Sequence, residues 1–238
     1  MPYLTELHCH TAEVSDCGKI SAAEVVEKYI KAGYTTLNIA NHLSPATFNG
    51  PQEKYKGGDS WKEKIDFFLE GVRLVKEAAG DRINILWCIE YRNIYDANDY
   101  LVFGVTEEFL YANPNILDLR VKEASKRFRD AGMFFCQAHP FRNGIAMVNP
   151  KYLDAIEVYN GHAGHDSRND IALMWAKKFE MRMLSGTDTH QDIHIPSGGI
   201  ETDMPITSNE QLLEVLKSGN YTPLHIGEEP IYGVYYKK

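Results

Sequence analysis

Short apolar segments alternate with segments of helical character along most of the chain, and this alternation constrains the fold more than any other feature. Strands that alternate with helices form a mostly parallel sheet with right-handed crossovers. Several segments are apolar at nearly every position, as expected for strands buried on both faces. The sequence therefore predicts an α/β fold, with a barrel as the preferred architecture. The expected strands are Tyr3–His10, Thr35–Ala40, Ile83–Glu90, Tyr100–Val105, Met133–Gln137, Ala155–Tyr159 and Met181–Leu184.

An open, doubly wound sheet is the alternative architecture. It is disfavoured because no Gly-x-Gly-x-x-Gly loop follows the first expected strand. No internal repeat or low-complexity segment divides the chain, so we expect a single domain over residues 1–238.

Several expected helices have recognisable starts and stops. A Ser followed three residues later by Glu or Gln is the pattern of a capping box, and a glycine marks the end of the helix. Further helices are expected at about 118–132 and 170–179, whereas 43–59 has the polar composition of a long loop. The capped helices run from Ser21 with Glu24 to Gly33, from Ser60 with Glu63 to Gly80, and from Ser208 with Gln211 to Gly219.

The ends of several expected strands carry residues that bind metal ions. His8 and His10 alternate on an extended segment, so their side chains project from one face, roughly 6–7 Å apart. Glu90 ends a largely apolar run, and a carboxylate at a buried strand end needs a partner. Each residue alone has an ordinary structural explanation, but the strand ends of a parallel barrel meet at one rim. The candidates are His8, His10, His42, Glu90, His139, Asp188 and His190.

Imidazole nitrogens combined with carboxylate oxygens suit Zn²⁺, Mn²⁺ or iron, and no cysteine is placed as an evident thiolate ligand. The candidates exceed what one tetrahedral ion requires, so two or three divalent metal ions are expected. Metal ions ~3.5–4 Å apart and bridged by a carboxylate are the usual arrangement for hydrolysis of phosphate esters. The ligand set therefore indicates a metal-dependent phosphoesterase.

The composition disfavours some classes of partner. Among 238 residues, 25 are basic and 33 acidic, giving a net charge of −8 without a basic cluster. Long nucleic acid is therefore not an expected partner, whereas a small phosphorylated substrate is compatible with bound cations. No apolar run approaches the ~20 residues that cross a bilayer, and the N-terminus lacks the character of a signal peptide. We expect a cytoplasmic protein with no membrane partner and reduced cysteines.

The motifs together resemble those of the PHP family, the polymerase and histidinol phosphatase superfamily of metal-dependent phosphoesterases. The resemblance covers essentially the whole chain. The opening motif of the family, His-x-His-Thr followed by Ser-Asp, is matched by 8–11 and by Ser15-Asp16. The later motifs are matched by Asn41-His42, Ile89-Glu90, His139-Pro140 and Asp188-Thr189-His190.

This resemblance implies a distorted seven-stranded β/α barrel and three metal positions. The first metal would be held by His8, His10, Glu90 and Asp188. Glu90 would bridge to a second ion that is also bound by His139. A third ion would be held by Asp16, His42 and His190.

Three departures from the family pattern affect these assignments. Asp16 lies one residue later than in the usual motif, which makes Glu13 a rival ligand. Asn41 stands where the family usually has Asp. Leu101 occupies a position where a family histidine often binds the second metal, and Asp99, on the same strand face, is the candidate substitute.

Arginine and histidine residues near the strand ends are candidates for binding the substrate. Arg142 comes first, because it directly follows a ligand loop and a guanidinium group binds phosphate in a bidentate manner. Arg92 is the second candidate and Arg168 the third. His162 and His165 follow the sixth strand, where contact with substrate, proton donation or simple solvation are all open.

These observations predict hydrolysis of a small phosphomonoester by a metal-bound hydroxide. A phosphodiesterase or exonuclease on short nucleotides and a phosphotyrosine-protein phosphatase are alternative enzymes. A non-catalytic, metal-stabilised binding domain is the alternative outside enzymes, and the departures at Asn41 and Leu101 favour it.

Overall fold

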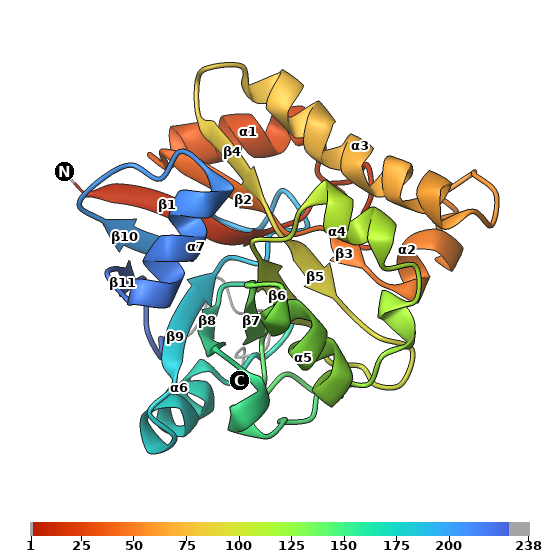
Figure 1. Ribbon diagram of the computed structural model, residues 1–238. Helices are drawn as coiled ribbons and strands as arrows, with labels where there is room; N and C mark the ends of the chain where they lie inside the picture. The colour runs from red at the N-terminus through yellow and green to blue at the C-terminus, as the bar shows by residue number, and fades with distance from the viewer. Residues whose placement is uncertain (1, 229–238) are drawn as a thin grey trace.

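Two β-sheets form the centre of the molecule (Figure 1). The computed structural model describes residues 2–228. The strands are β1 Tyr3–Cys9, β2 Thr36–Ile39, β3 His42–Leu43, β4 Asn84–Trp87, β5 Ile89–Tyr91, β6 Tyr100–Phe103, β7 Phe134–Gln137, β8 Ala155–Asn160, β9 Arg182–Gly186, β10 Ile200–Thr202 and β11 Thr222–Pro223. The first sheet has the order β11-β10-β1-β2-β4, and the second has the order β3-β5-β6-β7-β8-β9.

The expected strands are present, and one of them is divided. The strand expected at Ile83–Glu90 is interrupted at Cys88, which separates β4 from β5. In the first sheet β2 pairs parallel with β4, and in the second sheet β3 pairs parallel with β5. Because β3 follows β2 and β5 follows β4 along the chain, the chain passes twice from the first sheet into the second. β6 is antiparallel to both of its neighbours, whereas β7, β8 and β9 are parallel. The α/β fold is therefore confirmed, but the pairing is mixed, with five parallel and four antiparallel pairs among the described strands.

The expected closure of seven strands into one barrel is not shown, because the described strands form two separate sheets. The reason lies at the edge of β1 that faces away from β2. There, β10 pairs antiparallel with residues 3–5 and occupies the edge that β9 would need. Near its other end β1 does meet the segment after β9, since Asp188 N donates to His8 O (2.8 Å) and His10 N donates to Thr189 O (3.0 Å). The two ends of the sheet system are therefore joined on the side where the candidate ligands lie.

The buried carboxylate of Glu6 stabilises this junction between β1 and the segment after β9. Its Oε1 accepts hydrogen bonds from the backbone amides of Leu7 (3.0 Å), His8 (2.8 Å) and Thr187 (2.9 Å). Its Oε2 accepts from the hydroxyls of Tyr29 (2.9 Å) and Thr187. Burial raises the pKa of Glu6, and the hydrogen bonds from Thr187 oppose that shift. All of these partners are donors, so only an acceptor group fits the position.

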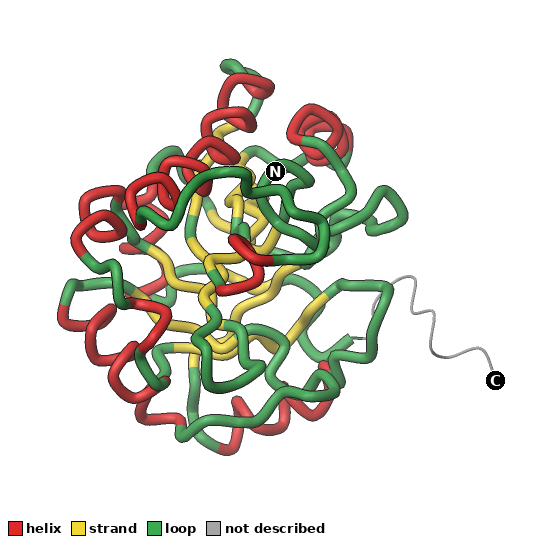
Figure 2. Tube along the Cα trace, turned by 90° about the vertical axis from the view of Figure 1, so that its right-hand side faces the viewer, coloured by secondary structure: helices red, strands yellow, loops and turns green. Residues whose placement is uncertain are grey.

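Helices surround the strands, which occupy the interior (Figure 2). Ser21 and Glu24 form the predicted capping box of α1. Ser60 is the N-cap of α3 but makes no capping hydrogen bond with its side chain, so the second predicted box does not form. The expected loop at 43–59 contains the short helix α2. The helices are α1 Ala22–Lys31, α2 Pro45–Asn49, α3 Trp61–Ala79, α4 Glu107–Ala112, α5 Val121–Asp130, α6 Asn169–Lys178 and α7 Asn209–Ser218.

Leu101 belongs to the apolar core. It is fully buried in a cluster that includes Leu7, Cys88 and Cys136, and α7 contributes Leu212 to the same cluster. Leu101, which departs from the family pattern, is therefore a packing residue of the core. Within residues 2–228, none of the helices has the length and apolar character needed to cross a bilayer.

Replacing Glu6 by Gln tests the junction. The substitution places a donor NH₂ group against the surrounding donors, so we expect the free energy of unfolding to fall by about 2–3 kcal/mol. Urea unfolding followed by circular dichroism measures the change. Glu201→Gln, at a partly exposed position of β10, is the matched control. Equal unfolding free energies for Glu6→Gln and wild type would contradict the role given to Glu6.

Candidate metal centre

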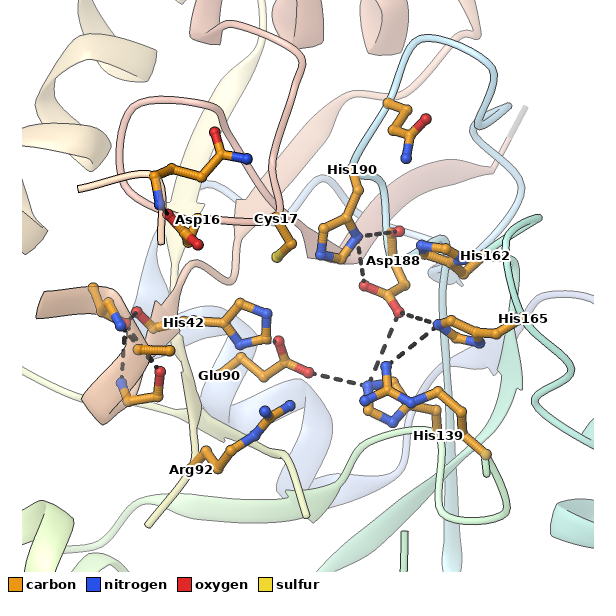
Figure 3. Close-up of a pocket in the computed structure, with 16 residues that line it drawn as sticks. Asp16, Cys17, His42, Glu90, Arg92, His139, His162, His165, Asp188 and His190 are labelled. Carbon is orange, nitrogen blue, oxygen red and sulfur yellow. Dashed lines mark hydrogen bonds and ion pairs between the residues drawn. The ribbon is translucent and has the colours of Figure 1, made fainter. Parts of the chain in front are cut away.

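Five of the strand-end candidate ligands line one pocket of about 460 Å³ (Figure 3), and His8 and His10 lie buried against two of them, Glu90 and Asp188. Glu90 lies on β5, His42 on β3 and His8 on β1, while His139 follows β7 and Asp188 follows β9. These positions are strand ends or the residues just beyond them. The structure therefore brings together side chains that are far apart in the sequence, as the parallel arrangement predicts.

His8 and His10 are each oriented through the ring nitrogen that faces away from the cluster. Nδ1 of His8 lies 2.9 Å from Oε1 of Glu157, a carboxylate that can only accept. Nδ1 of His10 lies 3.0 Å from Oγ of Ser15, whose own proton is donated to Oδ1 of Asn41 (3.0 Å). These acceptors assign a proton to Nδ1 of both rings. The Nε2 atom of each ring is therefore the one available to a metal ion.

Glu90 lies among four imidazoles. Its Oε1 is 3.2 Å from Nε2 of His8 and 3.2 Å from Nε2 of His139. Its Oε2 is 3.2 Å from Nε2 of His10 and 2.7 Å from Nδ1 of His42. Each carboxylate oxygen thus faces a different pair of histidines. This is the placement that a bridging carboxylate between two metal ions requires.

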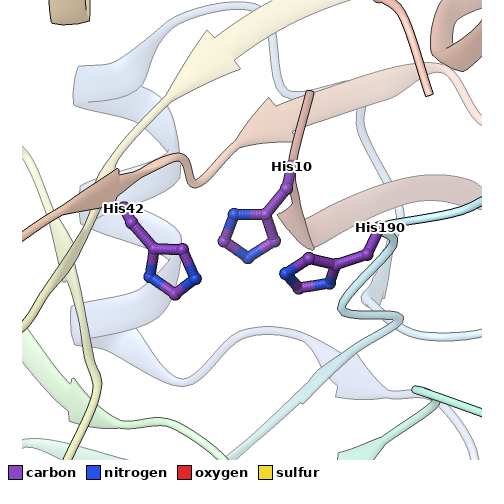
Figure 4. Close-up of side chains that lie close together, drawn as sticks. All are labelled: His10, His42 and His190. Carbon is purple, nitrogen blue, oxygen red and sulfur yellow. The ribbon is translucent and has the colours of Figure 1, made fainter. Parts of the chain in front are cut away.

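Asp188 is the second central carboxylate. Its Oδ1 lies 3.4 Å from Nε2 of His8 and 3.3 Å from Nε2 of His10, and its Oδ2 accepts from Nδ2 of Asn160 (3.2 Å). Its backbone oxygen lies 3.0 Å from Nδ1 of His190. That carbonyl assigns the proton of His190 to Nδ1, which leaves Nε2 as the ligand atom. In Figure 4 the ring of His10 lies between those of His42 and His190.

Several buried atoms of the cluster make no hydrogen bond among the described residues, although most of them lie in ion-pair contact with a group of opposite charge, and a missing hydrogen bond is costly away from water. Cations bound among them would satisfy these atoms, and the mixture of imidazole and carboxylate donors suits divalent ions. The unpartnered atoms are His8 Nε2, His10 Nε2, Glu90 Oε2, His139 Nδ1 and Asp188 Oδ1. Groups whose ligand atoms lie within 4.8 Å of one another include His8/His10/Asp188, His8/Glu90/His139 and His10/His42/His190.

Attraction between the histidines and the carboxylates of this cluster affects their pKa values more than burial does. Burial lowers the pKa of His8, but neighbouring carboxylates, Asp188 first among them, raise it well above its usual value. Burial likewise opposes charge on His190, and Asp188 raises its pKa to about 10. Burial raises the pKa of Glu90 and Asp188, yet the adjacent histidines hold both well below the usual range. A metal ion that binds here therefore displaces protons from imidazoles.

Two of the ligand positions have strained backbone. His139 has φ 27° and Asp188 has φ 54°, in the left-handed region that non-glycine residues rarely adopt. Hydrogen bonds hold both in place, because His139 N donates to Oε2 of Glu157 (2.8 Å) and Asp188 N donates to His8 O (2.8 Å). Strain of this kind is concentrated at functional sites, where the surrounding structure enforces it.

Asp99 lies at the pocket between two arginines. Arg92 donates from Nε to Oδ1 (2.7 Å) and from Nη2 to Oδ2 (2.6 Å), and Arg142 donates from Nη2 to Oδ2 (3.3 Å). Both arginines line the pocket, with 31% and 23% of their side chains exposed. Arg168 instead donates to Phe141 O and to Asn143 Oδ1, which gives it a structural role.

The two rival acidic residues of the first loop have partners outside the cluster. Asp16 Oδ1 accepts from Gln52 N (3.1 Å), and Glu13 Oε1 accepts from Ala22 N (2.8 Å) at the start of α1. Within residues 2–228, neither belongs to a group of close ligand atoms. The assignment of Asp16 as a ligand stays a prediction.

Cys17, next to Asp16, lies beside His42 and His190 (Figure 3). Burial raises the pKa of the Cys17 thiol, but the two imidazoles outweigh burial and lower the pKa to about 4.

Three further histidines lie around the same pocket. His162 Nδ1 accepts from Gly164 N (2.8 Å) and His194 Nδ1 accepts from His190 N (3.0 Å), so in each neutral ring the proton is on Nε2. Burial lowers the pKa of His162 to about 2, of His165 to about 3 and of His194 to about 4. These rings are therefore neutral near pH 7. His162 and His165 line the pocket, as expected for residues after the sixth strand.

The sequence analysis did not identify Glu157, Cys17 and His194 as parts of this centre. Glu157 had a usable signal, since it is a carboxylate within an apolar strand, as Glu90 is. His194 lies four residues after His190, in a segment without a helical or strand pattern. Nothing in the sequence indicates that the side chain of Cys17 is directed toward the histidines.

Comparison with known proteins identifies related folds. No family model matches the chain, and no curated protein matches it. A structure from Bifidobacterium adolescentis, assigned as a metal-dependent phosphoesterase, aligns with a TM-score of 0.50 and 14% identity over 91% of this chain and 97% of that chain. An amidohydrolase from Chromobacterium violaceum, solved with sulfate and no metal, aligns with a TM-score of 0.50 and 12% identity over 92% and 97%. At these identities the likeness shows the fold alone.

Replacing Glu157 by Gln tests how the first histidine is positioned. The substitution weakens the acceptor at Nδ1 of His8, so we expect metal affinity to fall about 10–100-fold, as for other residues that orient a ligand. Competition titration against a chelator measures the affinity. Glu214→Gln, on the exposed surface of α7, is the control. Equal affinities for Glu157→Gln and Glu214→Gln would contradict this role.

Proposed function

We propose that this protein is a metal-dependent phosphoesterase of the PHP type that hydrolyses a small phosphomonoester. The observation that carries the proposal is the set of buried, unpartnered imidazole and carboxylate atoms beside a pocket lined by two arginines. The motifs of the sequence support it, and one structural neighbour is itself assigned as a metal-dependent phosphoesterase. The distorted seven-stranded barrel of the family is part of the proposal.

Divalent Zn, Mn or Fe ions would be held by the residues that the motifs indicate. His8, His10, Glu90 and Asp188 would hold the first ion, Glu90 with His139 the second, and His42 with His190 the third. Such ions supply positive charge to the phosphate and lower the pKa of a bound water. The chain contributes by directing the Nε2 atoms of His8, His10 and His190 into the site, since acceptors fix their protons on Nδ1.

Arg142 and Arg92 would bind the phosphate group. Two guanidinium groups share one carboxylate, Asp99, so one positive charge is left to face an anion. Asp99 is fully buried and fixes the position of both arginines. His165 Nε2 also lies 3.3 Å from Nη1 of Arg142. Because the guanidinium group of Arg142 can only donate, Nε2 of His165 must accept, and a neutral ring can do so.

The size of the pocket supports a small substrate. Its volume of about 460 Å³ lies in the range of sites for small molecules. The net charge of −8 disfavours a long polyanion. A phosphomonoester fits these constraints, with its phosphate between the metal ligands and the arginines.

The test is a substrate panel combined with ligand substitutions. Protein loaded with Zn²⁺, Mn²⁺ or Fe²⁺ is assayed against phosphomonoesters, phosphodiesters, dinucleotides and phosphotyrosine peptides. We expect turnover of a small phosphomonoester, and its loss in His8→Ala and Asp188→Ala while the circular dichroism spectrum is retained. Arg73→Ala, on the exposed face of α3, is the control.

Two results would contradict the proposal. Turnover of phosphodiesters alone would assign the protein to the alternative class of phosphodiesterases. Tight binding of metal with no hydrolysis of any ester would instead support a metal-stabilised binding domain.

Substitution of Arg142 tests the phosphate site separately. We expect Arg142→Ala to lower kcat/KM about 10- to 100-fold, the loss that corresponds to one charge-assisted hydrogen bond. Arg142→Lys keeps the charge but loses the planar, bidentate geometry, so its kcat/KM should be intermediate. Steady-state kinetics on the best phosphomonoester provide the measurement. An Arg142→Ala enzyme with the kinetics of Arg73→Ala would remove Arg142 from the site.

A further inference from the structure

Cys17 reaches the pocket, in contrast to the other cysteines. It lines the pocket together with His42 and His190, and its thiol interacts electrostatically with both imidazoles. Figure 3 shows the sulfur directed toward the space between these two imidazoles. Of the four cysteines, all of which lie in the described part of the chain, Cys17 alone lines the pocket, while the others are buried. A soft donor therefore stands beside two nitrogen donors.

The neighbouring imidazoles are already spaced as metal ligands. The ligand atoms of His10, His42 and His190 lie within 4.8 Å of one another. Nε2 of His10 is fully buried and has no hydrogen-bond partner in residues 2–228. His42 and His190 therefore offer two closely spaced nitrogen ligands next to Cys17, while Nε2 of His10 also faces Glu90 and Asp188.

The carboxylate that the family motif would supply is engaged elsewhere. Asp16 Oδ1 accepts from Gln52 N (3.1 Å). Its carboxylate also packs against Gly50 so closely that a Cβ at position 50 would lie 2.7 Å from Cγ of Asp16. Turning Asp16 toward the histidines would break both contacts. The thiol of the next residue already points there.

The loop that carries Cys17 is fixed from several sides. Nζ of Lys54 donates to three backbone carbonyls of residues 12–18, at 2.6, 2.6 and 3.1 Å. Asn41 Oδ1 accepts from Thr11 N (2.9 Å), and Lys19 N donates to His190 O (2.7 Å). The last bond ties the Cys17 loop directly to one of the histidines. The thiol is therefore preorganised beside its partners.

We propose that Cys17 is a thiolate metal ligand that completes a site with His42 and His190, in the place that the family resemblance gives to Asp16. On binding, a sulfur–metal bond forms and the proton displaced from the cluster of Cys17, His42 and His190 passes to water. A ligand set of one thiolate and two imidazoles selects Zn²⁺ or Fe²⁺ over Mn²⁺ or Mg²⁺. This inference rests on the metal centre of the proposed function and names the ligand and metal preference of its third position.

Cobalt is the probe, because a thiolate ligand gives Co²⁺ an intense near-ultraviolet charge-transfer absorption that imidazole and carboxylate ligands do not give. The full-length protein, stripped by a chelator and titrated with Co²⁺, should develop this band. Cys17→Ser should lose the band and bind one equivalent fewer, although its three other cysteines remain. Asp16→Asn should keep both the band and the number of equivalents. Cys17→Asp should keep the stoichiometry without the band and bind Mn²⁺ more tightly relative to Zn²⁺.

Contrary results would overturn either the assignment of Cys17 or the proposed activity. A band that persists in Cys17→Ser, or two or more bound equivalents of Co²⁺ with no band in the wild type, overturns the assignment of Cys17. Phosphomonoester turnover by the same wild-type preparation separates the two proposals. Turnover without the absorption band would support the phosphoesterase and contradict the assignment of Cys17 as a ligand. The band without turnover would support Cys17 as a ligand and contradict the phosphoesterase. Matching circular dichroism spectra and urea midpoints exclude misfolding of Cys17→Ser as the cause.

Discussion

The metal centre depends on the register between β1 and the segment that follows β9. His8 and Asp188 come from opposite ends of the sequence, and the bond from Asp188 N to His8 O places them side by side. Glu6 reinforces this register, because one of its oxygens accepts from the amides of both His8 and Thr187. A slip of one residue would turn His8 and His10 out of the site and bring Leu7 and its neighbours in, since successive strand side chains face opposite sides.

Around this junction, acceptors fix the protonation of the ligands. The protons on Nδ1 of three histidines face three chemically different acceptors: the carboxylate of Glu157 for His8, the hydroxyl of Ser15 for His10 and the backbone carbonyl of Asp188 for His190. The remaining nitrogens and the carboxylates then converge with few donors between them. Bound cations would neutralise that arrangement, so metal binding at these residues would stabilise the folded state. Asn41 takes part through Ser15, and its Nδ2 donates to Oγ1 of Thr11 (3.2 Å), a bond that uses the amide group at that position.

The sequence was sufficient for seven of the strand segments, for the capped start of α1 and for the meeting of most candidate ligands at one place, because each rests on a local pattern. Glu90 and His139, for example, follow apolar strands, and parallel pairing then determines where they meet. The closed barrel was not shown because β10, a strand of three residues without a periodic pattern, pairs with the free edge of β1. The direction of the Cys17 side chain was not predicted, because it depends on Lys54, which holds the loop from a distant part of the chain. Such contacts between loops leave no trace in a local pattern.

In the proposed phosphoesterase, the departure at Leu101 would change how the site balances the charge of a phosphate. Leu101 packs in the apolar core, and the nearby polar position is occupied by Asp99 with Arg92 and Arg142. Where the family resemblance places a neutral imidazole for the second metal, this chain has one carboxylate shared by two guanidinium groups. Guanidinium charge is permanent, whereas the charge of a metal ion is present only when the ion is bound. In the proposed phosphoesterase, part of the attraction for a phosphate would therefore be built into the polypeptide, and anion binding would depend less on the second ion than in a site with a full set of histidines.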